Sequence, residues 1–381
     1  MRKLGFGLMR LPLKNPNDQS SIDIEEVKRM VDMYMERGFT YFDTAYPYHG
    51  GKSEIAFREA VAKRYPRERF TVTDKMPCWD VSKEDDLERI FNEQLEKCGV
   101  DYFDYYWLHA LNHEYVKTMD RVDGWGFIAR KKAEGKIRHI GFSFHDDSKL
   151  LEQLLKEHPE VEYVQLQINY LDWDSPTVES ETCYNLCTKY GKQVIVMEPV
   201  KGGSLATVPT GVEELFKGYN PDASPASWAI RYVASLPNVL TVLSGMSTME
   251  QVEDNTSFMQ DFKPLDREEQ MRMEQAAQII KRSIAIPCTA CHYCTDGCPM
   301  EICIPEYFNI YNTLYQFGRK EQWNNTSVYY GVLNKTHGKA SDCIECGQCE
   351  EHCPQHIQII DSLKLVAKTF ECEQGNPLLF I

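Results

Sequence analysis

The sequence has no hydrophobic run of the roughly 18–20 residues that a membrane-spanning helix requires. Its opening residues, MRKLGFG, contain no apolar signal-peptide core. Positive charge is also scarce, because 42 Lys and Arg stand against 57 Asp and Glu, which gives a net charge of −15. Phosphate contacts need clustered basic residues, so this balance argues against nucleic-acid binding. The sequence therefore predicts a cytoplasmic protein that binds neither membranes nor nucleic acids.

Cysteine is the residue whose distribution divides the chain. Of the 14 cysteines, nine lie between Cys288 and Cys353, whereas the first 280 residues hold four. Many cysteines without an export signal indicate metal binding in a reducing compartment rather than a disulfide framework. A chain of 381 residues is long enough for two domains. We expect them over residues 1–265 and 266–381, the second opening with a helix over Asp266–Ser283.

In the first domain, short apolar runs alternate with segments of helical periodicity. The expected strands are Leu4–Met9, Phe39–Asp43, Phe70–Lys75, Phe103–His109, Ile137–Phe142, Tyr163–Gln167, Val194–Val196 and Val239–Leu243. Short strands rich in β-branched and aromatic residues are typical of buried parallel strands. About eight βα units of this length predict an α/β fold, a TIM (β/α)8 barrel, followed by a small, mainly helical, ferredoxin-like domain. The alternative, an open doubly wound sheet, is disfavoured because no glycine-rich dinucleotide fingerprint follows any strand.

Two segments of the second domain share the spacing Cys-x2-Cys-x2-Cys-x3-Cys-Pro. The first run is Cys288, Cys291, Cys294 and Cys298, and the second is Cys343, Cys346, Cys349 and Cys353. Three evenly spaced thiolates let one loop reach three corners of a 4Fe–4S cluster, and in two-cluster ferredoxins the fourth cysteine binds the other cluster. By that rule Cys353 completes the cluster of the first run and Cys298 that of the second. Structural zinc sites are the alternative, but zinc has no use for a third evenly spaced cysteine.

Four polar residues stand at or just after the ends of predicted strands, where TIM barrels keep their active sites. They are Asp43, Tyr48, Lys75 and His109. A lysine beside a tyrosine lowers the pKa of the phenol, which can then pass a proton to a carbonyl oxygen. An aspartate keeps the lysine charged, and a histidine can donate a hydrogen bond to a developing alkoxide. Each residue alone also fits an ordinary structural role, but the four together indicate a catalytic site.

The sequence around Asp43 resembles the signature of the aldo-keto reductases. The similarity rests on Phe42-Asp43-Thr44-Ala45-Tyr46-Pro47-Tyr48 with Gly51, Ser53 and Glu54, and then on Leu108-His109, Gly141-Phe142-Ser143 and Gly245…Asn255 in the family's order. It covers about the first 260 residues. Together with the cysteine runs, the chain resembles a branch of that family with an appended ferredoxin domain.

This resemblance implies an NAD(P)H-linked oxidoreductase that acts on a small carbonyl or alcohol substrate. Tyr48 would be the general acid, Lys75 and Asp43 would tune it, and His109 would orient the carbonyl. The implied cofactor contacts are Ser143 and Gln165 for the nicotinamide carboxamide, Gly5 and Gly7 for close approach to the first strand, and Lys201, Gly202, Gly203, Gly245 and Asn255 for the phosphates and adenosine.

The sequence departs from the family's usual cofactor site at three places. Phe144 stands where the family usually has Asn, and Met197 stands where an aromatic ring usually stacks on the nicotinamide. The segment Gly245–Gln251 contains no Arg or Lys to bind a 2′-phosphate. These departures leave the choice among NADH, NADPH and a flavin open.

The presence of clusters beside a hydride-transfer site leaves four functions open. Hydride transfer moves two electrons whereas a cluster moves one, and a flavin commonly links the two processes. The first hypothesis is NAD(P)H-linked carbonyl reduction with clusters that pass electrons, and the second is a ferredoxin-linked reductase with a flavin in the barrel. The others are an ordinary reductase with structural clusters and an electron-transfer module with a scaffold barrel, which has no need of the four catalytic residues. A redox protein partner is expected wherever the clusters carry electrons.

Overall fold

The chain forms two compact units, each described here by itself. The computed structural model describes residues 2–16, 18–175, 178–282, 285–288, 290, 292–295, 297–317, 325–353 and 355–371. One unit comprises Met1–Ala206 with Asp222–Met273, and the other comprises Thr207–Pro221 with Glu274–Ile381. The division after residue 273 falls inside helix α11 (Arg267–Arg282), which begins one residue after the start expected from the sequence.

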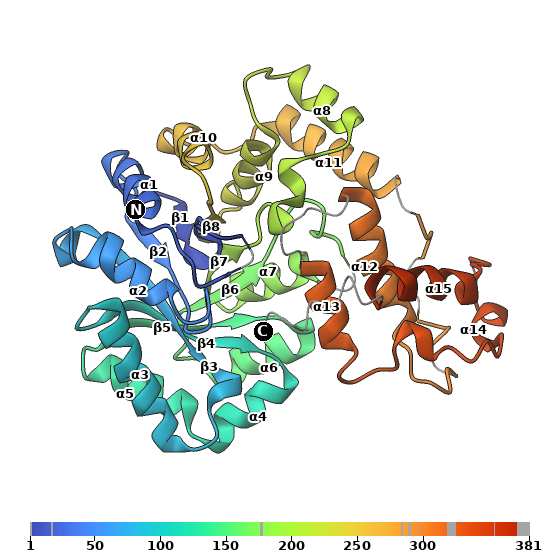
Figure 1. The fold of residues 1–381 in the computed structure, drawn as a ribbon, viewed down its shortest axis with the longest axis horizontal. Coiled ribbons are helices and arrows are strands. Elements are labelled where there is room, and N and C mark those ends of the chain that lie inside the picture. The colour runs from blue at the N-terminus through green and yellow to red at the C-terminus, as the bar shows by residue number, and fades with distance from the viewer. Residues whose placement is uncertain are drawn as a thin grey trace. The chain divides into compact units, whose positions relative to one another are not determined.

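The first unit contains a closed barrel of eight parallel strands (Figure 1). The strands are β1 (Leu4–Gly7), β2 (Tyr41–Asp43), β3 (Thr71–Pro77), β4 (Phe103–Leu111), β5 (Ile137–Phe144), β6 (Tyr163–Gln167), β7 (Gln193–Met197) and β8 (Val239–Gly245). Each strand pairs with the next along the chain, and β8 pairs with β1 to close the barrel. Every strand overlaps its predicted range, so the predicted TIM barrel is confirmed.

Helices alternate with these strands along the sequence. They are α1 (Ile24–Glu36), α2 (Ser53–Phe57), α3 (Glu84–Cys98), α4 (His113–Arg121), α5 (Gly124–Ala133), α6 (Ser148–Glu157), α7 (Ser180–Lys189), α9 (Pro225–Ala234) and α10 (Met249–Gln260). Helix α6 shows why these segments are helical: the Asp147 side chain accepts a hydrogen bond from Leu150 N, 2.9 Å away, and caps the helix. Its four leucines recur at helical spacing and are buried, which leaves the polar face to solvent.

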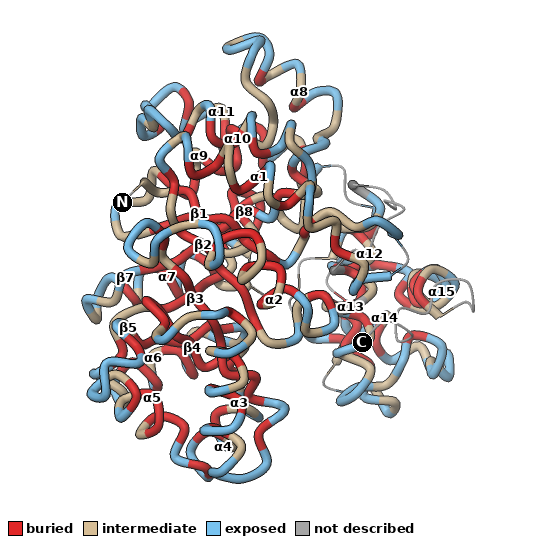
Figure 2. The backbone as a smooth tube through the Cα atoms, turned by 60° about the vertical axis from the view of Figure 1, so that its left-hand side comes forward, coloured by how far each residue is buried: buried red, intermediate tan, exposed pale blue. Residues whose placement is uncertain are grey.

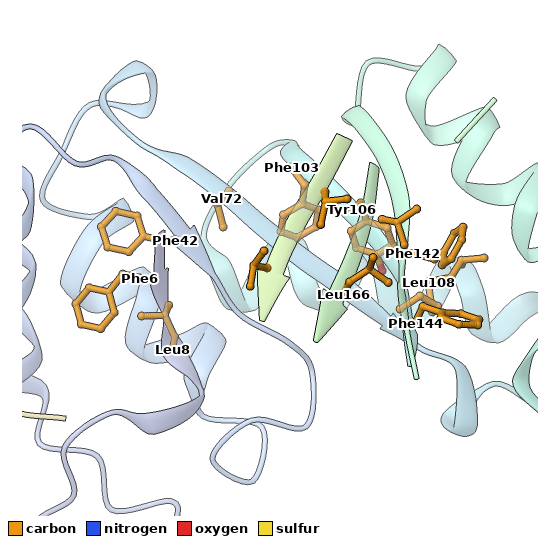
Figure 3. Packing of buried hydrophobic residues seen from close by; sticks show 14 of the residues in the cluster. Phe6, Leu8, Phe42, Val72, Phe103, Tyr106, Leu108, Phe142, Phe144 and Leu166 are labelled. Carbon is orange, nitrogen blue, oxygen red and sulfur yellow. The ribbon is translucent and has the colours of Figure 1, made fainter. Parts of the chain in front are cut away.

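The strands separate two apolar cores. The larger core packs the outer faces of the strands against the helices and includes Phe6, Phe42, Tyr106, Leu108 and Phe142 (Figure 3). The smaller core lies inside the barrel and consists of Tyr41, Tyr105, Trp107, Ile195 and Leu243. Side chains alternate between the two along each strand, as the period of a β-strand requires. The strands are buried along most of their length (Figure 2).

The second unit is mainly helical, as expected. Its helices are α8 (Thr210–Lys217), α12 (Ile304–Phe317), α13 (Asn325–Leu333), α14 (Gln348–Glu351) and α15 (Ile359–Phe370), together with the end of α11. Three aromatic rings join α12, α13 and α15, because Tyr330 lies 4.6 Å from Tyr307 and 5.0 Å from Phe370 between ring centroids. Within the described parts of the chain, no helix is both long and apolar enough to span a membrane.

Candidate active site and cluster-binding sites

The alternation of side chains places the predicted catalytic residues at one mouth of the barrel. Asp43 follows Tyr41 by two positions on β2, and His109 follows Trp107 by two positions on β4, so both continue the rows that form the inner core. Lys75 occupies the equivalent inward position near the end of β3. All three lie at the carboxyl ends of their strands, where a TIM barrel builds its site.

Lys75 is the centre of this group, and its side chain is fully buried. Its Nζ lies 2.6 Å from Asp43 Oδ1, 2.7 Å from the Thr44 carbonyl oxygen and 3.5 Å from the Tyr48 hydroxyl. The backbone of Lys75 is held as well, since Asp74 Oδ1 accepts from its N–H at 2.8 Å and Gln94 Nε2 donates to its carbonyl at 2.9 Å. These five neighbours fix the ammonium between a carboxylate and a phenol.

Burial and charge act against each other on the ionisable groups. Burial raises the pKa of Asp43, and the Lys75 ammonium opposes this rise. Burial would lower the pKa of Lys75, but the Asp43 carboxylate raises it, so the net pKa is raised and the ammonium stays protonated. Burial also raises the pKa of Tyr48; Lys75 lowers it, as expected, but the net pKa lies above its ordinary value. The phenol is therefore protonated before reaction.

His109 is neutral as well. Burial, together with the positive charge of Lys75 and the neighbouring His145, lowers its pKa well below 6.5. Its ring centroid lies 6.0 Å from that of Tyr48 and 5.0 Å from that of Trp79, which is 40% exposed. Trp79 was not predicted from the sequence. Its place two residues after the end of β3 is the signal that could have indicated it.

Ser143 and Gln165 lie side by side on β5 and β6, as their register pairing shows. The Ser143 hydroxyl accepts a hydrogen bond of 2.7 Å from Ala110 N–H, which follows His109 in a left-handed conformation with φ of 56°. Gln165 Nε2 lies 3.7 Å from Met197 Sδ. Its Oε1 is buried and has no hydrogen-bond partner among the residues that the structure describes. A buried amide oxygen without a donor fits a carboxamide such as that of nicotinamide.

The glycines of the predicted cofactor site lie at the ends of β1 and β8. Gly7 pairs in register with Asp43 on one side and with Gly245 on the other, so it lies close to the predicted catalytic residues. A Cβ atom on Gly245 would lie 3.1 Å from the Cδ of Arg10, so the aliphatic stem of Arg10 lies against this glycine. Arg10 therefore brings a cation to the end of β8 that the local sequence there lacks. The sequence did not predict this placement.

The other predicted cofactor residues have protein partners. Lys201 Nζ lies 2.7 and 2.8 Å from the two carboxylate oxygens of Asp172, and Gly202 follows it with φ of 64°. Asn255 is buried, and its Nδ2 donates to Ser244 Oγ at 3.0 Å. A phosphate near Lys201 would thus have to share the ammonium with Asp172. Contacts of these residues with a cofactor stay predictions.

The second unit contains two cavities lined by cysteines. The first is lined by Cys288 and Cys294 of the first run and by Cys353 of the second. The second is lined by Cys343, Cys346 and Cys349 of the second run and by Cys298 of the first. Cys291 lies outside the described residues. The fourth cysteine of each run thus lies with the other run, which is the arrangement that the two-cluster rule predicts.

The chemistry of these cavities fits iron–sulfur clusters. Apart from the thiols, the lining is largely apolar, and Ile304 contributes to both cavities. Burial and the neighbouring Cys343 raise the pKa of Cys349 to about 11, because a second thiolate nearby disfavours the first. Thiolates gathered in an apolar cavity need positive charge, which soft iron centres supply. No disulfide links the cysteines that the structure describes.

The barrel, the residues at its mouth and the paired cysteine cavities define an oxidoreductase with a ferredoxin-type domain. A model of the aldo/keto reductase family matches residues 3–278, and a model of the 4Fe-4S dicluster domain matches residues 287–358. The chain therefore belongs to the aldo/keto reductase family. The expected resemblance to that family, with an appended two-cluster domain, is confirmed.

Individual relatives agree with this assignment. An "uncharacterized oxidoreductase" of Schizosaccharomyces pombe is 26% identical over 272 residues, which cover 67% of this chain and 80% of the relative. An aldo-keto reductase of Mycolicibacterium vanbaalenii is 27% identical over 234 residues, covering 60% of this chain and 76% of the relative.

Solved structures share the fold. The holo form of a Bacillus halodurans aldo-keto reductase has a TM-score of 0.58 at 24% identity and covers 72% of this chain and 91% of its own. A Klebsiella pneumoniae aldo-keto reductase in complex with NADPH has a TM-score of 0.55 at 18% identity, covering 72% and 90%.

Proposed function

We propose that the barrel reduces small carbonyl compounds, or oxidises the corresponding alcohols, with NAD(P)H, and that the second unit carries single electrons through two 4Fe–4S clusters. The observation that supports the first part best is the chain of contacts from Asp43 through Lys75 to Tyr48. A neutral histidine beside this chain completes the group. Small carbonyl substrates are characteristic of the family to which the chain belongs.

In this proposal Tyr48 gives its proton to the carbonyl oxygen. Lys75 favours this transfer, because a positive charge 3.5 Å from the phenol oxygen stabilises the phenolate that remains. Asp43 keeps Lys75 charged and oriented within the buried site. His109 is neutral and can donate a hydrogen bond to the same substrate oxygen as negative charge develops on it.

We also propose the residues that hold the cofactor. Ser143 and Gln165 would bind the carboxamide of a nicotinamide, which supplies the hydride when bound. The unpartnered Gln165 Oε1 supports this role, and the NADPH named with the Klebsiella pneumoniae structure supports a nicotinamide over a flavin. Gly7, Gly202 and Gly245 would line the cofactor, with Asn255 and Lys201 near its adenosine and phosphates.

Replacing Tyr48 by Phe tests the catalytic part of the proposal. The hydroxyl is lost but the ring stays, so carbonyl reduction should fall by about 100- to 10,000-fold, the usual worth of general acid catalysis. The measurement is NADH- and NADPH-dependent reduction of a panel of aliphatic and aromatic aldehydes and ketones. Tyr46→Phe is the matched control, because Tyr46 lies in the same loop and donates to Glu93, 3.1 Å away. Equal rates in the Tyr48 and Tyr46 variants would show that Tyr48 is not the proton donor.

The electron-transfer part rests on the two cysteine cavities. Because Ile304 lines both, clusters bound there would be neighbours and could exchange single electrons. Electrons would then pass to the barrel or to a redox protein partner. The same cavities lie within the apolar core of the unit, which makes a purely structural role of the clusters the second candidate.

A kinetic experiment separates these two roles of the clusters. Dithionite-reduced protein is mixed anaerobically with a carbonyl substrate, without NAD(P)H, and cluster absorbance is followed. Reoxidation on the timescale of turnover supports electron transfer to the barrel. In a second reaction NAD(P)H is added, and clusters that stay reduced through repeated turnovers pass no electrons to the barrel. Such clusters are either structural or deliver electrons to a protein partner. Addition of an oxidised ferredoxin distinguishes these two cases.

A further inference from the structure

His49 follows the proposed proton donor directly and has an unusual backbone conformation. It is the first of three consecutive left-handed residues, with φ of 56° for His49, 60° for Gly50 and 78° for Gly51. Glycine adopts this region freely, whereas a residue with a Cβ atom is strained there. Two of the three positions are indeed glycine. A histidine at the first position indicates that its side chain makes contacts that offset the strain.

The imidazole of His49 is buried and bonded at both nitrogens. Its Nε2 accepts a hydrogen bond of 3.1 Å from Leu11 N–H, so this nitrogen carries no proton. Its Nδ1 therefore carries the proton and donates to the Gln19 carbonyl oxygen, 2.9 Å away. Both partners are backbone groups, so the ring connects two main-chain segments and fits in one tautomer and one orientation.

The segment to which His49 is hydrogen-bonded is itself attached to the barrel. It runs from β1 to α1 and folds back on itself, because Leu13 and Ile22 form an antiparallel bridge and Lys14 N–H donates to the Ser21 carbonyl at 2.7 Å. A second contact joins the two segments, since Ser53 Oγ donates to the Leu8 carbonyl at 3.0 Å. The loop that contains Tyr48 is thus fastened, through His49 and Ser53, to the segment that follows β1.

The main chain of Tyr48 directly precedes the first of these points of attachment and is hydrogen-bonded within the loop. Its N–H donates to the Ala45 carbonyl at 3.1 Å, and its own carbonyl accepts from Gly51 at 3.1 Å and from Ser53 at 3.2 Å. The loop is a series of tight turns whose direction depends on the left-handed run at 49–51. Movement of His49 would therefore move the Tyr48 hydroxyl, which lies 3.5 Å from Lys75 Nζ.

We propose that His49 is a positioning residue: its imidazole fastens the Tyr48 loop to the segment of residues 11–19 and so holds the phenol beside Lys75. This role rests on the proposed function of Tyr48 as proton donor. A displaced proton donor lowers the rate of the chemical step, and a misplacement of about 1 Å can cost about 100-fold. The proposed carboxamide contacts, Ser143 and Gln165, lie on β5 and β6, so kcat should change more than KM for NAD(P)H.

The test compares His49→Gly with His49→Gln. His49→Gly relieves the backbone strain but removes both imidazole bonds, so kcat should fall about 10- to 100-fold, whereas KM for NAD(P)H should change less than about twofold. His49→Gln offers an amide acceptor and donor and should recover most of the lost kcat. Glu179→Gly is the control: Glu179 is also left-handed, with φ of 51°, and accepts from Ser148 N–H at 2.6 Å, but it does not adjoin Tyr48. It should keep the kcat of the wild type.

Hydrogen–deuterium exchange gives a readout that does not depend on catalysis. His49→Gly should speed exchange in peptides covering residues 8–23 and 44–53, and leave the other barrel strands unchanged. A wild-type protein without carbonyl reductase activity would refute the proposed function while this measurement still tests the fastening. Unchanged exchange in both peptides, or a wild-type kcat in His49→Gly, would overturn the positioning role.

Discussion

Replacing Lys75 by Met should destabilise the barrel as well as inactivate it. The ammonium and the Asp43 carboxylate are 2.6 Å apart, and both side chains are almost completely buried. With an effective dielectric constant of about 20, their attraction is about 6 kcal/mol. Among the described residues, no group bonds to Asp43 Oδ2, so the carboxylate depends on Lys75. Removing one partner of a buried pair usually costs about 3–5 kcal/mol of unfolding free energy, and we expect that range here.

The loss should depend on pH in a defined direction. Burial raises the pKa of Asp43 in the folded protein above 3.8, and without Lys75 the rise is larger. A raised folded-state pKa means that the native state binds the proton more tightly than the unfolded state does, so stability increases as pH falls. The difference in unfolding free energy between Lys75→Met and wild type should therefore be largest at pH 8 and shrink toward pH 5. Adding Asp43→Asn to Lys75→Met should restore part of the lost stability, because it removes the uncompensated charge.

Urea unfolding followed by tryptophan fluorescence measures this loss in the barrel. Five of the six tryptophans lie in the first unit: Trp79, Trp107, Trp125, Trp173 and Trp228. Lys189→Met is a matched control, since Lys189 pairs with Glu152 at 2.8 Å but is largely exposed. An unfolding free energy of Lys75→Met within about 1 kcal/mol of wild type at pH 8, where a buried pair should count most, would refute the reasoning.

Two further predictions concern the clusters and His109. Anaerobically prepared protein should contain about eight irons and eight acid-labile sulfides per chain; stoichiometric zinc without sulfide would contradict this. Cys353→Ser should perturb the cluster of the first run. Cys303→Ser, at a buried thiol outside both runs, should not. Because the folded-state pKa of His109 is well below 6.5, the native state binds fewer protons there than the unfolded state, so stability should fall as pH drops below about 6.5. The His109→Asn variant should lose less stability over that range, and its kcat/KM should be lower by about 100-fold or more at pH 7.5. If the unfolding free energies of wild type and variant depended equally on pH, that result would argue against a buried neutral histidine.

The parts of the site that depend on strand periodicity were predictable from the sequence. Asp43, Lys75 and His109 end apolar runs whose period of two fixes the face on which each side chain lies. Parallel strands joined in order then bring their ends to one mouth of the barrel. The cysteine spacing was equally informative, because the chemistry of a cluster dictates the distance between its ligands along the chain.

Contacts made by loops could not be predicted in the same way. The bond between His49 and Leu11 joins residues 38 positions apart, and no periodicity links them. Lys201 pairs with Asp172, 29 residues away, through the conformations of two loops. The pKa of Tyr48 also depends on how deeply the loop buries the phenol, whereas the sequence indicated only the effect of a nearby lysine.

Helix α8 changes what it would mean to separate the two units. Residues 207–221, which contain this helix, belong to the second unit although they interrupt the sequence of the barrel. Val212 and Phe216 of this helix are buried, and Gly211 lies close to Ile279 of α11, where an added Cβ would be 3.7 Å from its side chain. A stop codon after residue 265 would therefore remove Ile279, with the rest of α11, from beside α8. The second compact unit is thus interleaved with the first in sequence, and a gene encoding the first unit alone would need a redesigned segment at 207–221 as well as a new end.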